Sequence, residues 1–119
     1  MAFDGDYAMV IGGKRVRGSA TLAVVNPATE QAIAEVPDCT REELDQAIAA
    51  ARAAFPGWAA PPIEERRAKL NALGDAVLAR LDDFKRLLTS EQGKPHEEAA
   101  GEVMGAGYWL KGAASLDLP

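Results

Sequence analysis

Residues 40–93 read TREELDQAIAAARAAFPGWAAPPIEERRAKLNALGDAVLARLDDFKRLLTSEQG, and this stretch decides the fold because it carries three consecutive helical patterns. Thr40 precedes Glu43 by three positions, the spacing of a capping box in which each side chain satisfies an amide at a helix start. Pro56 and Gly57 predict the end of this first helix, since proline lacks a backbone donor and clashes with the preceding turn. Its apolar face has helical spacing and consists of Leu44, Ala47, Ile48, Ala51, Ala54 and Phe55.

The other two helices of this stretch follow a linker that ends in two prolines. Pro62 predicts the start of the second helix, because proline in a first turn costs no hydrogen bond. Asp82 or Asp83 is expected to cap the third helix, which should end at Gly93, a good left-handed terminator. The buried face of the second helix is predicted to contain Ile63, Leu70, Leu73, Val77 and Leu81, and that of the third Phe84, Leu87 and Leu88.

A fourth helix is expected to begin just after Pro95 and to run to about Ala114. It contains glycines at positions 101, 105, 107 and 112. Each costs a helix roughly 1 kcal/mol relative to alanine. A face with so many glycines therefore predicts the close approach of another element.

The first third of the chain reads as two β-hairpins. Gly12 and Gly13 separate two short strand-like runs, and such turns need residues that tolerate positive φ. The second pair of runs covers residues 21–25 and 31–36. Asn26 and Pro27 lie between them and favour a turn. Isolated hairpins are marginal in water, so both need a surface to lie against.

The whole chain is therefore predicted to be α+β and mostly helical, with two hairpins followed by about four helices. Its 119 residues suit a single unit, residues 1–119, with hairpins in 7–36 and a helical region in 40–115. The net charge of -5 disfavours nucleic acid and anionic membranes as partners. The single cysteine, Cys39, cannot form an internal disulfide, and no signal or membrane-spanning pattern is present, so we expect a cytoplasmic protein.

Two glycine motifs resemble nucleotide-binding loops only in part. Gln92-Gly93-Lys94-Pro95 lacks the earlier glycine and the hydroxyl residue of a phosphate-binding loop, which favours a helix end followed by a solvated lysine. Gly105-Ala106-Gly107 begins a dinucleotide fingerprint, but Leu110 stands where the third glycine belongs and a helix precedes the motif. Helix packing explains this second motif better.

The side chains that could carry chemistry have simpler structural explanations. Cys39 precedes a helix cap, where a thiol can become nucleophilic, but a small buried or half-buried residue is the favoured reading. His96 lacks a second ligand at position 100, which disfavours a metal site. Glu97 and Glu98, like the other paired carboxylates, suit the positive end of a helix dipole.

Two tryptophans complete the candidates. Trp58 and Trp109 are expected to be core or interface anchors rather than residues that stack on a ligand. No general acid and base face each other at a predictable distance. We therefore predict no catalytic, cofactor-binding or metal-binding residue in this chain.

Taken in order, the chain resembles the amino-terminal segment of the aldehyde dehydrogenase superfamily. No single piece is decisive, but the order and spacing of the pieces are specific, and they cover about residues 7–110. The matching pieces are Ile11-Gly12-Gly13-Lys14, Val25-Asn26-Pro27-Ala28-Thr29-Glu30, Ile33-Ala34-Glu35-Val36-Pro37, residues 44–55 with Trp58, Glu65-Arg66-Arg67 with Leu70 and Leu73, Thr89-Ser90-Glu91-Gln92-Gly93-Lys94-Pro95 with Glu98, and Glu102-Val103.

The resemblance implies far more than this chain contains. Family members are roughly four times longer and oxidise aldehydes to carboxylic acids with NAD or NADP, through a thiohemiacetal on a cysteine. Their nucleophile, glutamate base, oxyanion asparagine and cofactor-binding lysine all fall downstream of this segment, and Cys39 does not match the nucleophile's motif. The segment wraps the cofactor-binding domain as scaffold, so this chain should lack the central Rossmann sheet and bind no cofactor by itself.

Two functions remain open from the sequence. The first is a scaffold portion of an aldehyde dehydrogenase, inactive alone and expected to be a fragment. The alternative is a stand-alone helical module for protein–protein interaction. In either case the apolar helix faces predict self-association.

Overall fold

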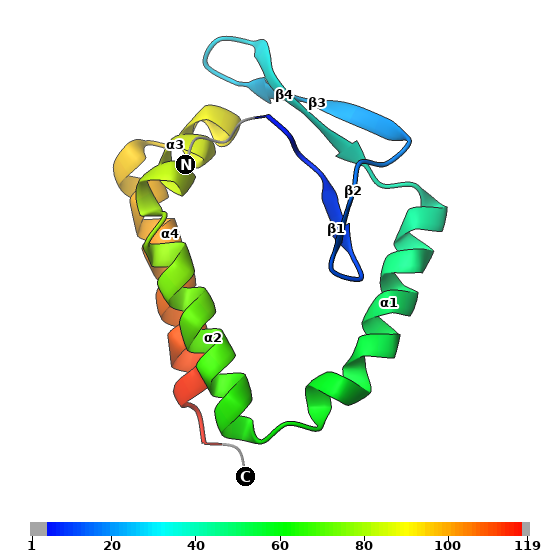
Figure 1. The fold of residues 1–119 in the computed structure, drawn as a ribbon. Helices are drawn as coiled ribbons and strands as arrows, with labels where there is room; N and C mark the ends of the chain where they lie inside the picture. Colours follow the sequence, from blue (N-terminus) through cyan, green and yellow to red (C-terminus); the bar gives the residue numbers. More distant parts are fainter. Residues whose placement is uncertain (1–4, 118–119) are drawn as a thin grey trace. The chain divides into compact units, whose positions relative to one another are not determined.

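A computed structural model describes residues 5–117, which form two compact units that divide after Ala60. The first unit contains two hairpins and one helix, and the second contains three helices (Figure 1). The two antiparallel strand pairs and four helices confirm the predicted fold class. Neither pair extends into a larger sheet among the described residues.

Both hairpins form where the turn residues predict them. Strands β1 (Met9–Ile11) and β2 (Lys14–Val16) are antiparallel, and Gly12 and Gly13 supply the turn with φ of 58° and 77°. Strands β3 (Ala20–Asn26) and β4 (Gln31–Asp38) form the second pair. At their turn the Ala28 amide donates to the side-chain oxygen of Asn26 at 2.9 Å, which is the local bond that favours asparagine before proline.

Helix α1 (Arg41–Ala59) begins with the predicted capping box. The Glu43 amide donates to Thr40 Oγ1 at 3.3 Å, and the Thr40 amide donates to Glu43 Oε2 at 2.9 Å. The predicted end at Pro56 and Gly57 is wrong, because α1 continues through both residues to Ala59. Proline removes only its own donor, and the Pro56 carbonyl still accepts a hydrogen bond from the Ala60 amide at 3.1 Å.

The apolar face of α1 is largely uncovered. The turn of the first hairpin lies close to this helix, where a Cβ atom at Gly12 would lie 3.7 Å from Ala50 Cβ. Leu44, Ile48 and Phe55 share a face at helical spacing, yet 46%, 47% and 66% of their surfaces are exposed. Within the described residues of its unit, α1 therefore has an unpartnered apolar stripe.

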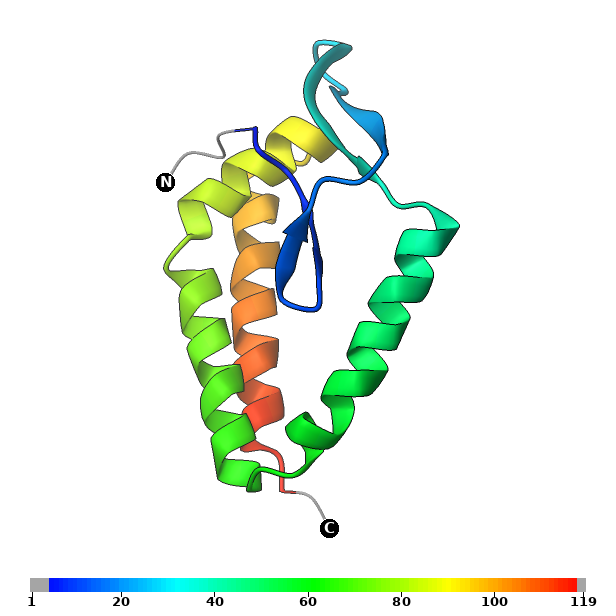
Figure 2. The same cartoon turned by 45° about the vertical axis from the view of Figure 1, so that its right-hand side comes forward.

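Three helices make the second unit: α2 (Ile63–Leu78), α3 (Leu81–Gln92) and α4 (His96–Ser115). Helices α2 and α4 lie side by side and antiparallel, and α3 crosses one end of the pair (Figures 1 and 2). Pro62 and Pro95 stand at the starts of α2 and α4, as predicted. Gly93 ends α3 in the left-handed region with φ of 71°, also as predicted.

The predicted cap of α3 is wrong, because the helix begins earlier than Asp82 and Asp83. Its cap residue is Arg80, whose carbonyl accepts from the Phe84 amide at 3.1 Å. Asp82 and Asp83 instead occupy the first turn, where a negative charge interacts favourably with the helix dipole. Only Ala79 and Arg80 separate the end of α2 from the start of α3. The helical hydrogen bonds of α3 therefore begin at the Arg80 carbonyl, before Asp82.

The core of the three-helix unit is small and lies along α4. Ala99, Val103, Gly107 and Ala114 are its buried residues, at a spacing that places them on one face toward α2 and α3. Gly74 is the buried residue of α2. Leu70, Val77 and Phe84 are half-buried, but the prediction that Leu73 is buried is wrong, because 51% of its surface is exposed.

Two glycines allow α2 and α4 to approach closely. A Cβ atom at Gly107 would lie 2.5 Å from Leu78 Cγ, and one at Gly74 would lie 3.0 Å from the Gly107 carbonyl oxygen. Real Cβ atoms essentially never show the first distance, so a larger residue at position 107 would force the Leu78 side chain or the helices to shift. The predicted close approach of another element is confirmed at this glycine.

Replacing Gly107 with leucine should therefore destabilise the protein. Overpacking a core costs about 1–3 kcal/mol, and the four carbons that leucine adds favour the upper end of that range. Leucine also has a higher helix propensity than glycine, by roughly 1 kcal/mol, which offsets part of this cost. We expect Gly107→Leu to lower the free energy of unfolding by about 2 kcal/mol in urea denaturation followed by circular dichroism. Gly105→Leu is the matched control and should not destabilise, since no neighbour lies within 4 Å of a Cβ there.

Candidate functional site

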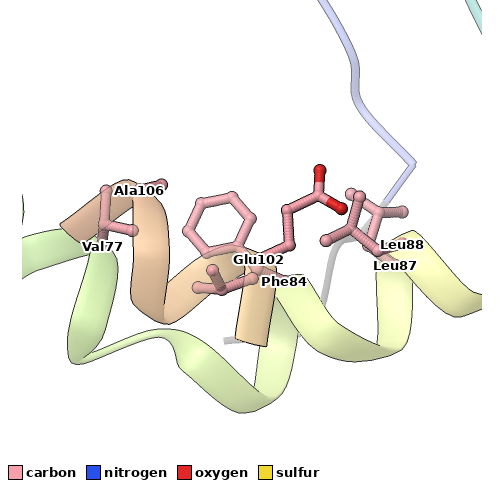
Figure 3. Close-up of a pocket in the computed structure, with 7 residues that line it drawn as sticks. Val77, Phe84, Leu87, Leu88, Glu102 and Ala106 are labelled. Atoms are coloured by element: carbon pink, nitrogen blue, oxygen red, sulfur yellow. The ribbon is translucent and has the colours of Figure 1, made fainter. Parts of the chain in front are cut away.

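A groove of about 280 Å³ opens among the three helices of the second unit (Figure 3). Its position follows from the sequence, because the apolar residues of α3 recur at helical spacing and face the end of α2 and the middle of α4. The lining residues are Val77, Phe84, Leu87, Leu88, Glu102, Val103 and Ala106. The sequence predicted a buried face here, and the structure shows an open apolar hollow.

The lining contains one charged side chain, Glu102, which projects beside the Phe84 ring (Figure 3). Its carboxylate forms an ion pair with Lys94, from the short link between α3 and α4. No other lining residue of this groove can titrate. The groove can therefore accept an apolar group.

Charged residues also border the groove at Phe84. The Arg80 guanidinium lies 5.6 Å from the centroid of that ring, within the range of a cation–π interaction. Arg80 Nε also lies 3.5 Å from an Asp83 carboxylate oxygen. These contacts hold the α2–α3 turn against the first turn of α3.

The two glycine motifs are helix features. Gly93 is the end of α3, as predicted, but Lys94 is half-buried and paired with Glu102 rather than solvated. Gly105, Ala106 and Gly107 lie in the middle of α4, with no strand before them. The geometry around this second motif does not fit a dinucleotide, because a fingerprint loop needs a turn between a strand and a helix.

Cys39 and His96 are both exposed residues with local contacts. The prediction that Cys39 is buried or half-buried is wrong: the thiol lies just before the cap of α1, with Sγ 3.5 Å from the Thr40 carbonyl oxygen. His96 begins α4, and its Nδ1 lies 3.3 Å from Thr89 Oγ1. Neither residue lines the groove.

Two further kinds of site concern residues 5–117: a metal centre and a membrane-spanning helix. No group of three His, Cys, Asp or Glu side chains among them is arranged to hold a metal ion. Within the same range, none of the helices combines the length and hydropathy required to span a membrane. Trp58 and Trp109 are 45% and 81% exposed, so neither is a core anchor within the described chain, and a role at an interface stays a prediction.

Asp82, within the described part of the chain, has a shifted pKa. The hydrogen bond from Lys85 Nζ to Asp82 Oδ1, 2.8 Å long, lowers the pKa of Asp82, and the charges of Lys85 and Arg86 act in the same direction. Asp82 is solvent-exposed, so this shift reflects a surface ion pair in the first turn of α3. Such a pair stabilises a helix start and does not indicate a catalytic acid.

Similarity to known proteins defines the class of this chain. A model described as the aldehyde dehydrogenase family matches residues 15–116. A probable aldehyde dehydrogenase from Pseudomonas sp is 43% identical over 113 residues, which is 95% of this chain and 23% of that relative. The chain belongs to the aldehyde dehydrogenase family, and the resemblance seen in its sequence is confirmed.

Solved structures agree with this assignment. A succinate-semialdehyde dehydrogenase from Burkholderia pseudomallei matches 95% of this chain with a TM-score of 0.88 and 35% identity. An NAD-dependent benzaldehyde dehydrogenase from Corynebacterium glutamicum matches 96% with a TM-score of 0.89 and 29% identity. In both, the match covers 26% of the solved chain. The hairpins and helices are therefore part of an aldehyde dehydrogenase fold, and this chain spans about a quarter of its relatives' length.

The Asp82–Lys85 pair predicts a pH dependence of stability. Because the folded state lowers the pKa of Asp82, the carboxylate stabilises the folded state above its ordinary pKa of about 4. This contribution is lost as the pH falls from there through the lower folded-state pKa. Asp82→Asn should therefore unfold with a shallower acid dependence than the unmodified chain, measured as urea midpoints from pH 7 downward. Identical acid dependence in the two proteins would contradict the assignment.

Proposed function

We propose that this chain is an amino-terminal scaffold segment of an NAD(P)-dependent aldehyde dehydrogenase and does not catalyse hydride transfer alone. One observation carries the proposal: nearly the whole chain matches relatives of which it covers only 23–24%. In such an enzyme the reaction oxidises an aldehyde to a carboxylic acid, with a nicotinamide cofactor as hydride acceptor. The segment contributes shape and packing to that reaction.

The site geometry supports the absence of chemistry in this segment. The groove is apolar and its one carboxylate is paired with Lys94. Cys39 is a surface thiol beside a helix cap, and Gly107 of α4 is a packing residue. We therefore propose that the chain supplies no catalytic or metal-binding residue and binds neither NAD nor NADP by itself. An exposed, unpaired thiol also suits a reducing, cytoplasmic compartment.

Two enzyme assays test this proposal. The purified 119-residue chain, given several aldehydes with NAD or NADP, should produce reduced cofactor no faster than a blank without protein. A chimera in which this chain replaces the matched segment of the Pseudomonas relative should oxidise aldehydes, because the scaffold would be restored. Turnover by the isolated chain that is lost in Cys39→Ser, or a folded but inactive chimera, would contradict the proposal.

The exposed stripe of α1 supports a second proposal, that the isolated chain associates with itself. Leu44, Ile48 and Phe55 form a continuous apolar surface on one face of the helix, and such patches seek partners. The same exposure is what favours the alternative function, a helical interaction module. In a complete enzyme these surfaces would be covered by other parts of the polypeptide.

Sedimentation velocity over a range of concentrations measures this association. The unmodified chain should form species larger than a monomer, and Phe55→Glu should shift the distribution toward monomer by placing a charge in the stripe. Ala53→Glu is the control, since position 53 is exposed on the opposite side of α1. A compact monomer at high concentration would contradict self-association.

A further inference from the structure

The second hairpin has two outer edges, one on β3 and one on β4, and their residues differ. Strand β3 pairs with β4 along one side, and no other strand among the described residues pairs with its second side. Backbone amides and carbonyls along that second side are therefore open to a further strand. The strand reads ATLAVVN and contains neither a charged residue nor a proline. We refer to this unpaired side as the β3 edge.

Strand β4 carries the features by which natural proteins protect an exposed edge. It contains the charged residues Glu35 and Asp38, and Pro37 has no backbone amide to donate. It also bulges, because its register with β3 skips Ile33. Charges, proline and bulges all disfavour pairing with a further strand. Within this hairpin the protection is therefore confined to β4.

The side chains of β3 add to this contrast. Leu22 and Val25 leave 46% and 48% of their surfaces exposed, although both are apolar. Short segments that combine β-branched and apolar residues with no charge and no proline pair readily with copies of themselves. The β3 edge has this composition over its whole length.

A second copy of the chain fits the β3 edge because the strand is compatible with itself. When a strand pairs antiparallel with its own copy about a two-fold axis, each residue faces a residue of the same strand. With the axis at Ala23, the middle of β3, Leu22 faces Val24 of the second copy and no like charges meet. Self-pairing of β4 would instead bring the acidic residues of both copies into one ladder.

We propose that β3 pairs antiparallel with β3 of a second copy of this chain, which joins the two hairpins into one sheet. Backbone hydrogen bonds make the contact, and the side chains of Leu22 and Val25 extend the apolar surface across both copies. One short strand buries less than the roughly 1,200 Å² of a stable interface, so this association is weak and depends on concentration. The contact is distinct from the stripe of α1 and does not depend on the proposed enzyme role.

Hydrogen exchange followed by NMR tests this pairing in the Phe55→Glu chain, in which the α1 stripe is disrupted. Between micromolar and millimolar chain concentrations, the outward amides of β3 should become about tenfold more protected, because they enter a new ladder. The outward amides of β4 should keep the same exchange rates. Sedimentation of the same samples should show a dimer whose share grows with concentration.

A lysine on the β3 edge should remove both effects. Ala23→Lys places a charge at the centre of the strand, and lysine is a residue by which natural edge strands avoid pairing. The hairpin itself should persist, because the new charge faces Glu35 on β4. Ala32→Lys is the matched control, since Ala32 is an exposed alanine of β4 in the same hairpin, and it should leave the dimer and the β3 protection unchanged.

Each other outcome has a defined meaning. A Phe55→Glu chain that stays monomeric, with no rise in β3 protection, would overturn the inference and leave association through α1 standing. Equal protection of the β4 edge, an equal loss in Ala32→Lys, or a folded Ala23→Lys chain that still dimerises would also overturn it. Should circular dichroism show that Ala23→Lys does not fold, the exchange rates of the Phe55→Glu chain decide alone. None of these measurements involves aldehyde oxidation, so the proposed scaffold function stands or fails separately.

Discussion

At Gly107 the backbone of α4 lies against the side chain of Leu78 on α2, so close that a larger residue there would displace Leu78 or move the helices apart. The three-helix unit depends on this contact, because it sets the distance at which the two helices run together. Gly74 on α2 also lies close to α4, since a Cβ atom there would be 3.0 Å from the Gly107 carbonyl oxygen. The charged contacts across this pair follow from that spacing: Lys111 Nζ reaches Asp75 Oδ1 at 2.5 Å, and Arg67 donates to the Leu116 carbonyl at 2.6 Å.

Close packing through glycine leaves few large side chains in the core. The buried hydrophobic residues of α4 are Ala99, Val103 and Ala114, which together remove little apolar area from water. Hydrophobic stabilisation scales with that area, at about 25 cal/mol per Å². A unit built this way gains less from its own core than one built on leucine and phenylalanine.

Local chemistry explains why most of the fold could be predicted from the sequence. The hairpin turns, the capping box at Thr40 and the left-handed end at Gly93 each depend on residues within a few positions, and all are confirmed. The errors arose where local rules compete with the chain around them. Pro56 removes one donor but does not stop α1, and the short turn after α2 starts α3 before Asp82.

Burial was harder to predict, because it depends on what covers a face. Helical spacing identified the apolar faces containing Leu73 and Ile48 correctly as faces, but both residues are about half exposed. The groove has the same origin: Leu87 and Leu88 were expected to be buried, and no described residue fills the hollow they line. The Lys94–Glu102 pair was missed, since it joins positions eight apart across a helix boundary. No spacing rule for helices predicts an ion pair between these two positions.

Carboxylates of the second unit are engaged in contacts that stabilise its helices. Asp82, Asp83 and Glu102 each interact with a lysine or arginine from the same unit, and these contacts join helix ends to neighbouring turns. A catalytic acid or base must instead keep its proton affinity tuned toward a reacting group. The lowered pKa of Asp82 points the other way, since it keeps the carboxylate ionised at the start of α3. These ion pairs therefore stabilise the arrangement of the helices, which is consistent with the scaffold role proposed for the segment.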